Sequence, residues 1–335
     1  MVTIADVARA AGVAPSTVSY VLNGKRSISE PTRKRVLESV RQLGYQPHTG
    51  ARALASNRSD TIALVLPLRA GMDLLVLMQF AVSVVTTARA YDQHVLLVTA
   101  DEGAAGLERL AAGSTVDGLI VMDVEVEDAR VPALRALPCP SVLIGFPRDS
   151  EGLTCVDLDF RRAGALCVEH LAEQGHRHIA LLGAPQAVYN RATGFAQGTL
   201  TGFQEAVKQH DLTAWDVPCE QGYDAVRETV ERLLRQDPEL TGFVIHNEAA
   251  VGPLLEALRA HGKSVPEDVS VVAICPDEVA ERSSPPLTSV LVPAGESARR
   301  AVTLLMEKRS GTQVPQATLL TPWLTVRGST GPAPV

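Results

Sequence analysis

The 335-residue sequence predicts an α/β protein: a helix-turn-helix headpiece followed by a body of two doubly wound subdomains. Signals for short helices are dense before residue 45, and Lys and Arg are concentrated near the N-terminus. After residue 60, apolar runs of strand length alternate with helical stretches. Such alternation is typical of parallel sheets that are covered by helices and bind ligands at the carboxyl ends of their strands.

Three short helices are predicted in the headpiece. Their ends are marked by capping residues, prolines and glycines, namely Thr3 with Asp6 and Gly12, Pro15 with Asn23 and Gly24, and Ser29 with Pro31 and Gly44. Apolar residues recur on one side of each helix, at Ile4, Val7, Ala8 and Ala11, at Val18, Val21 and Leu22, and at Val36, Leu37, Val40 and Leu43. Two helices joined by a tight turn and supported by a third form a helix-turn-helix unit.

The second of these helices lies in APSTVSYVLNGK, residues 14–25, where small polar side chains surround few aliphatic ones. In a helix-turn-helix unit this helix enters the major groove, so its outward side chains approach phosphates and base edges. The predicted DNA contacts on this helix are Pro15, Ser16, Thr17, Ser19, Tyr20 and Asn23. Thr3, Ser29 and Thr32, near the starts of the neighbouring helices, complete the set within the headpiece.

Charge divides the chain in the same way. Residues 1–58 hold nine Lys or Arg against three Asp or Glu, a net charge of +6, so the rest of this chain of net charge −7 carries −13. A basic head on an acidic body is typical of a DNA-binding protein with a separate second function. From the charge alone, the alternative is that the basic residues near the N-terminus only form a solvent-exposed helical face.

The segments TIADVARAAGVAPSTVSYVLNG and SISEPTRKRVLESVRQLGYQPHTGARALASNRS resemble the headpiece and hinge of the lactose-repressor (LacI/GalR) family of bacterial transcription regulators. VDGLIVMD, AGALCVEHLAEQGHRHIALLG, VPEDVSVVAI and LTVRGST continue the resemblance along the chain. It implies a headpiece at 1–45, a hinge with a short helix at 46–59, and a periplasmic-binding-protein type I body for ligand binding and dimerisation at 60–335. Subdomain one would take about 60–160 and 292–320, and subdomain two about 161–291 and 321–331.

The hinge sequence ARALAS follows Pro47 and Gly50 and is too short to be a stable helix alone. The resemblance implies that the paired hinge helices of a homodimer enter the minor groove at the centre of an inverted-repeat operator. There Arg52 would contact DNA and Leu54 would be the apolar wedge that bends it. A linker leucine packed on the body is the alternative for Leu54.

The resemblance also implies a small-molecule effector, expected to be a carbohydrate, between the subdomains. Relatives grip sugars with an Arg where this chain has Thr199 and with a carboxylate where it has Cys275; Asn247 is retained, and Asp277 lies two residues after Cys275. Other candidate effector contacts, most of them following predicted strands, are Arg69, Tyr189, Asn190, Arg191 and Tyr223. The alternatives are surface positions for Arg69 and Arg191, a place in the core for Tyr223, and helix capping by Asp159 or Asp277.

Several classes of protein are not indicated. HExxH, GxSxG, P-loop and strand-linked GxGxxG motifs are missing, so the sequence does not predict an enzyme or a cofactor. Five widely spaced cysteines predict neither a disulfide framework nor a zinc site. Without a signal peptide or a long apolar run, we expect a cytoplasmic repressor of carbohydrate-utilisation genes. A regulator that senses a protein partner or a non-sugar metabolite, and a sugar-binding protein without gene control, are the alternatives.

Overall fold

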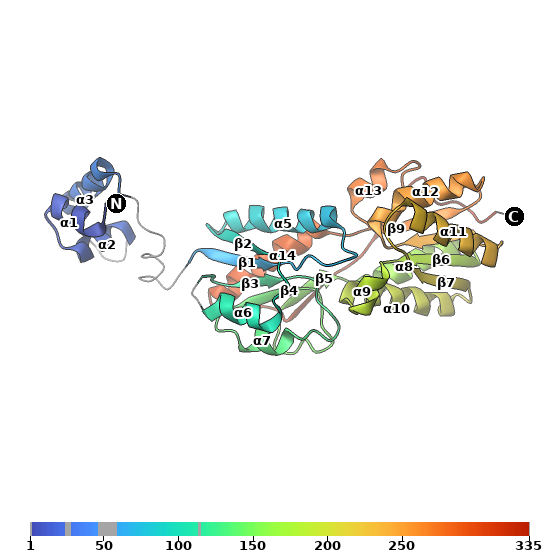
Figure 1. The fold of residues 1–335 in the computed structure, drawn as a ribbon, viewed down its shortest axis with the longest axis horizontal. Helices are drawn as coiled ribbons and strands as arrows, with labels where there is room; N and C mark the ends of the chain where they lie inside the picture. Colours follow the sequence, from blue (N-terminus) through green and yellow to red (C-terminus); the bar gives the residue numbers. More distant parts are fainter. Residues whose placement is uncertain (1, 24–27, 46–58, 113–114, 335) are drawn as a thin grey trace. The chain divides into compact units, whose positions relative to one another are not determined.

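The computed structural model describes residues 2–23, 28–45, 59–112 and 115–334 (Figure 1). The chain separates into two compact units, Met1–Ser59 and Asp60–Val335. Arg52, Leu54 and all but the last residue of the predicted hinge lie outside the described residues.

The described residues of the first unit form three helices, α1 (Ile4–Ala11), α2 (Pro15–Asn23) and α3 (Glu30–Leu43). Thr3 begins α1 with a reciprocal capping box: its hydroxyl accepts from the Asp6 backbone N–H, and its own N–H donates to the Asp6 carboxylate at 2.9 Å. Gly12 and Gly44 end α1 and α3 in the left-handed conformation, with φ of 64° and 61°. The helix ends predicted at Gly12 and Gly44 are therefore confirmed, and Gly24 lies outside the described residues.

One valine from each helix, Val7, Val18 and Val36, is fully buried in the centre of this unit. The prediction for α3 was partly wrong, because Leu37 and Leu43 are 44% and 37% exposed. The stripe of α3 that meets the other helices is narrow and includes Ser39, whose hydroxyl donates to the Arg35 carbonyl at 3.0 Å, in place of these leucines.

The body is built on two sheets, as predicted, and the structure shows six strands in each. The first has the order β11-β5-β4-β3-β1-β2 and is entirely parallel, with strands β1 (Thr61–Val65), β2 (His94–Val98), β3 (Leu119–Val121), β4 (Ser141–Ile144), β5 (Cys155–Leu158) and β11 (Ala317–Leu320). The second has the order β12-β10-β9-β8-β6-β7, with strands β6 (His178–Gly183), β7 (Thr213–Pro218), β8 (Gly242–Ile245), β9 (Ser270–Cys275), β10 (Thr288–Leu291) and β12 (Leu324–Thr325). Only β12 is antiparallel to its neighbour.

Helices cover both faces of each sheet (Figure 1). On the first sheet, one face carries α5 (Leu74–Arg89) and α14 (Ala294–Arg309), and the other carries α6 (Gly103–Ala112) and α7 (Val131–Ala136). On the second sheet, the pairs are α8 (Phe160–Glu173) with α10 (Gly194–Gln209), and α11 (Tyr223–Gln236) with α12 (Val251–Ala260). The shorter α9 (Gln186–Asn190), η1 (Glu248–Ala250) and α13 (Asp277–Arg282) follow strand ends.

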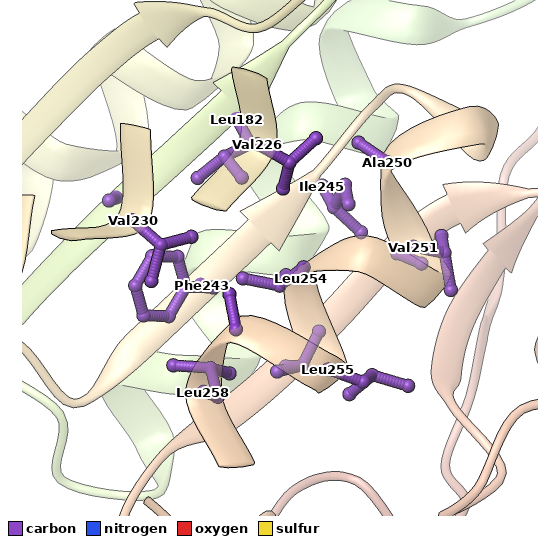
Figure 2. Packing of buried hydrophobic residues seen from close by; sticks show 14 of the residues in the cluster. Leu182, Val226, Val230, Phe243, Ile245, Ala250, Val251, Leu254, Leu255 and Leu258 are labelled. Atoms are coloured by element: carbon purple, nitrogen blue, oxygen red, sulfur yellow. The ribbon is translucent and has the colours of Figure 1, made fainter. Parts of the chain in front are cut away.

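The second sheet is closely packed on both of its faces. Phe243 and Ile245 of β8 pack between apolar side chains of α11 and α12 (Figure 2), and each large aliphatic or aromatic residue buried in this way contributes roughly 1.5–3 kcal/mol. On the other face, α8 and α10 approach so closely that a Cβ at Gly202 would lie 1.8 Å from the Arg161 carbonyl oxygen. Because both faces of the sheet are covered, the strand ends are the part of the sheet left to form a ligand site.

Candidate functional site

Helix α2 presents the predicted polar face. Pro15 and Ser16 are exposed and Thr17, Ser19 and Tyr20 are half-buried, whereas Val18 points into the core. Asn23 ends the helix, and its side chain lies outside the described part of the chain. The first unit therefore presents a helix with short, polar side chains outward, held by Val18 and by the partly buried Val21 and Leu22.

Residues at α1 and α3 add polar and basic groups to the first unit. Thr3 is exposed, and the Ser29 hydroxyl donates to that of Thr32 at 2.9 Å, so Ser29 occupies the cap position of α3 without capping a backbone N–H through its side chain. Arg9 and Arg41 pair with carboxylates of their own helices. Exposed pairs of this kind are weak, and the two arginines can exchange them for phosphate contacts.

A cavity lies in the body where the carboxyl ends of both sets of strands meet. The space between its atoms, including the solvent in its open mouth, is about 930 Å³. Residues after β1, β3 and β4 and within β5 line it from the first sheet, and residues after β6, β7, β8 and β10 line it from the second. This is the position where doubly wound sheets bind ligands.

Three rings form one wall of the cavity. The ring centre of Phe160, at the start of α8, lies 5.9 Å from the ring centre of Phe195 of α10 and 5.5 Å from that of His246, which follows β8. His246 is 5% exposed, and burial lowers its pKa to about 4, so the imidazole is neutral near pH 7. Its Nδ1 is buried without a hydrogen-bond partner among the described residues. This wall combines flat apolar surface with one unused polar atom.

Asn247 and the carboxyl groups form the polar part of the lining. The Asn247 amide donates to the Cys219 carbonyl at 2.7 Å, which fixes its orientation. Asp73 accepts from two backbone N–H groups at the start of α5. Burial raises the pKa of both Asp157 and Glu248 to about 7. The lining thus holds carboxyl groups whose charge changes near neutral pH.

Arg69 and Arg191 lie beside the cavity and are not among its lining residues. The Arg69 guanidinium forms ion pairs at 2.7–2.9 Å with Asp101, Asp123 and Glu125. Arg191 donates to the Ala70 and Ala187 carbonyls and lies 3.9 Å from Asp123. Asp123 lines the cavity, and its Oδ1 is buried without a partner in the described residues.

Of the effector contacts proposed from sequence, the structure brings Asn247 alone into the lining. Thr199 is fully buried on α10, which packs against α8; Cys275 is buried at the end of β9; and Asp277 pairs with Arg327 at 3.0 Å. Tyr189 packs against the small cluster of Ala184, Val188 and Ala196. Asn190 accepts from the Gln186 side chain, and Tyr223 is 43% exposed at the start of α11. Asp159 caps α8 by accepting from Arg162 N–H at 2.9 Å, which is the alternative considered for it.

Sequence reasoning missed His246, Asp123, Asp157 and the two phenylalanines. His246 directly precedes Asn247 after β8, and Asp123 is the last residue of the VMD run after β3. Their place after apolar strand runs was a usable signal. No such signal marked Asp157, because it lies within β5, and that strand was not predicted from the sequence.

The described ranges contain no group of three or more His, Cys, Asp or Glu placed to hold a metal ion, and the five cysteines are unpaired. Within the same residues, no helix is both long and apolar enough to cross a membrane.

A helix-turn-helix unit joined to a two-sheet body with a cavity at its strand ends is the construction of a ligand-responsive transcriptional regulator. Residues 3–48 match the family described as bacterial regulatory proteins, lacI family, and residues 168–330 match the periplasmic binding protein-like domain. The HTH-type transcriptional regulator CelR of Thermobifida fusca is 33% identical, over 98% of this chain and 98% of the relative. The chain belongs to the lacI family of bacterial regulatory proteins.

Solved structures agree with this assignment. The transcriptional regulator CelR–cellobiose complex superimposes with a TM-score of 0.69 at 29% identity, covering 98% of this chain and 100% of that one. The lac repressor dimer bound to operator and the anti-inducer ONPF gives a TM-score of 0.84 at 23% identity, covering 98% and 99%. The second likeness establishes the fold, which is the predicted one.

Asp157 should link the stability of the body to pH. Its pKa is about 7 in the folded chain, above its ordinary value near 4, so the folded chain holds the proton more tightly than the unfolded chain does. The stabilisation is complete below about pH 4 and is lost as pH rises through about 7. We expect Asp157→Asn to reduce the fall in melting temperature between about pH 5 and about pH 8, followed by circular dichroism.

Glu256→Gln, on the exposed side of α12, is the matched control and should keep the wild-type pH dependence. Glu248 keeps part of the dependence in Asp157→Asn, because burial raises its pKa as well. If the melting temperature of the Asp157→Asn protein depends on pH as fully as that of the wild type, Asp157 does not link the stability of the body to pH.

Proposed function

We propose that this regulator is a homodimeric repressor that binds an inverted-repeat operator and responds to a carbohydrate in the cavity of its body. The cavity at the strand ends carries the proposal, because it combines a ring wall, an oriented amide and carboxyl groups. The relative CelR was solved as a cellobiose complex, which supports a sugar as ligand. The proposed activity is binding without catalysis, in the cytoplasm where the DNA is.

DNA recognition is assigned to the polar face of α2. Short side chains there allow the helix backbone to come close to base edges, and the neighbouring arginines neutralise phosphates. Tyr20 sets a particular base preference, because its phenol offers one hydrogen bond and a ring for a thymine methyl. An Arg at this place would instead donate two hydrogen bonds to guanine.

In selection from random DNA, the wild-type protein should enrich a short inverted repeat. Tyr20→Arg should change the preferred base at one symmetric position by roughly 1–3 kcal/mol without abolishing binding. Gln42→Ala, an exposed amide on α3 outside the predicted DNA contacts, serves as the control and should leave the motif unchanged. Identical motifs from wild type and Tyr20→Arg would refute the assignment of Tyr20.

A second copy of the chain is expected on the outer face of α5. Leu75, Met78, Val82 and Val85 recur at helical spacing on this face, and Leu75 and Val82 are 79% and 60% exposed. The neighbouring strand β2 lies at the edge of the first sheet and exposes further leucines. Contiguous apolar surface of this kind marks an interface, and a two-fold operator requires a two-fold protein.

Val82→Asp should split the dimer, because it would bury a charge in an apolar interface without a partner. We expect mostly monomer in sedimentation at micromolar concentration and operator affinity at least about tenfold lower. Leu319→Asp is the matched control: Leu319 is 55% exposed on β11, at the opposite edge of the same sheet, and its variant should remain dimeric. A Val82→Asp protein that stays dimeric would place the interface elsewhere.

The effector response is assigned to the cavity, and Asn247 is its best-oriented polar donor. Mono- and disaccharides, including α-glucosides, are titrated into the protein–operator complex, and at least one should change operator affinity. Asn247→Ala should then remove that response while leaving ligand-free operator binding intact. Gln236→Ala, an exposed amide at the end of α11, should respond as wild type does. If no sugar changes operator affinity, the carbohydrate effector is wrong.

A further inference from the structure

The charge of the cavity lining restricts the class of effector. Four carboxyl side chains line it: Asp73, Asp123 and Asp157 from the first sheet and its helices, and Glu248 after β8. Among the described residues, neither Lys nor Arg is part of the lining. An anionic ligand would therefore meet carboxylates and no cation.

The nearest cations are already occupied. Arg69 faces three carboxylates, so its surroundings are negative even with its own charge counted. Arg191 donates through Nη1 to two backbone carbonyls, and its Nε lies 3.9 Å from Asp123. Neither guanidinium can turn to a ligand in the cavity without leaving Asp123 less compensated, and removing one partner of a buried pair is costly.

Two buried polar atoms in the lining lack partners. The Oδ1 of Asp123, a residue 8% exposed, and the Nδ1 of His246, a residue 5% exposed, have no hydrogen bond within the described structure. An unsatisfied buried atom is unfavourable, so a ligand that supplies its missing hydrogen bond gains affinity. A carboxylate oxygen can only accept, and the ligand group that suits Asp123 is therefore a donor.

We propose that the effector is a sugar without phosphate or carboxylate groups, whose hydroxyl or amino groups donate to the lining carboxylates and whose C–H face lies on the rings of Phe160 and Phe195. The inference rests on the carbohydrate effector proposed above and adds its charge class. Sugar phosphates and sugar acids are excluded, because their charge would be buried next to like charges. A neutral sugar and an amino sugar share the required donor chemistry.

The test compares derivatives of one carbon skeleton in the full-length protein. Glucose, glucosamine, glucose 6-phosphate and glucuronic acid form one set, and the corresponding galactose derivatives and trehalose with trehalose 6-phosphate form two more. Dissociation constants are measured by calorimetry at about pH 8, where Asp157 and Glu248 are mostly ionised. In every set that binds, the neutral or amino member should bind at least about tenfold more tightly than the anionic members.

A phosphorylated or acidic member that binds as tightly as its neutral counterpart overturns the inference and leaves the carbohydrate effector standing. If no member of any set binds, the carbohydrate effector itself fails, and the charge class fails with it. Tighter binding of glucosamine or galactosamine than of the parent sugar identifies the donor to the carboxylates as an amine; the reverse order identifies it as a hydroxyl.

Isosteric variants show whether the lining carboxylates cause the selectivity. The double variant Asp157→Asn with Glu248→Gln should reduce the ratio between neutral and anionic members several-fold, because two negative charges leave the lining. Glu256→Gln, on the exposed side of α12, should keep the wild-type ratio. Circular dichroism checks that the double variant folds. If the double variant does not fold, the inference is decided by the affinity ratio between neutral and anionic members that is measured with the wild-type protein. An unchanged ratio in a folded double variant contradicts the electrostatic cause.

Discussion

The candidate site depends on one constraint: parallel strands place all their carboxyl ends at the same edge of a sheet. Here the edges of two sheets meet, so residues that follow several of the apolar strands reach one cavity. Asp123 after β3 and His246 with Asn247 after β8 are brought together in this way, although more than one hundred residues separate them. Helices also begin at this edge, and Asp73 lines the cavity while it caps α5.

Local signals made the headpiece and most of the sheets predictable. The capping box of Thr3 and Asp6 and the left-handed glycines act within a few residues, so their effect can be derived from sequence alone. Apolar runs such as HIALLG became central strands. By contrast, TAWDVP forms β7 at an edge with much of its length exposed, and CVDL forms β5 with a carboxyl inside; neither has the apolar pattern of a buried strand.

The polar residues of the site were less predictable, because their surroundings are set by distant parts of the chain. Arg69 follows a strand, as a ligand-binding arginine would, but Asp101, Asp123 and Glu125 from two other strand ends converge on it. Thr199 was chosen by its correspondence to an arginine in relatives, and here it lies where α8 and α10 pack. Position along the chain identifies candidates, whereas pairing and burial decide which of them remain available to a ligand.

Contacts across the cavity connect ligand binding to the arrangement of the body. The Arg191 guanidinium donates to the Ala70 carbonyl at 3.0 Å, and backbone N–H groups of Val126 and Gly194 donate across to Ala192 and Val124 at 2.8 and 3.0 Å. A ligand that touches both walls favours arrangements in which these contacts form. Such a ligand can shift the equilibrium between two arrangements of the body, one with these contacts and one without them. The size of the shift is limited by the difference between the ligand's binding free energies for the two arrangements. Thermodynamic linkage then requires operator DNA to change the effector's affinity by the same factor that the effector imposes on DNA binding.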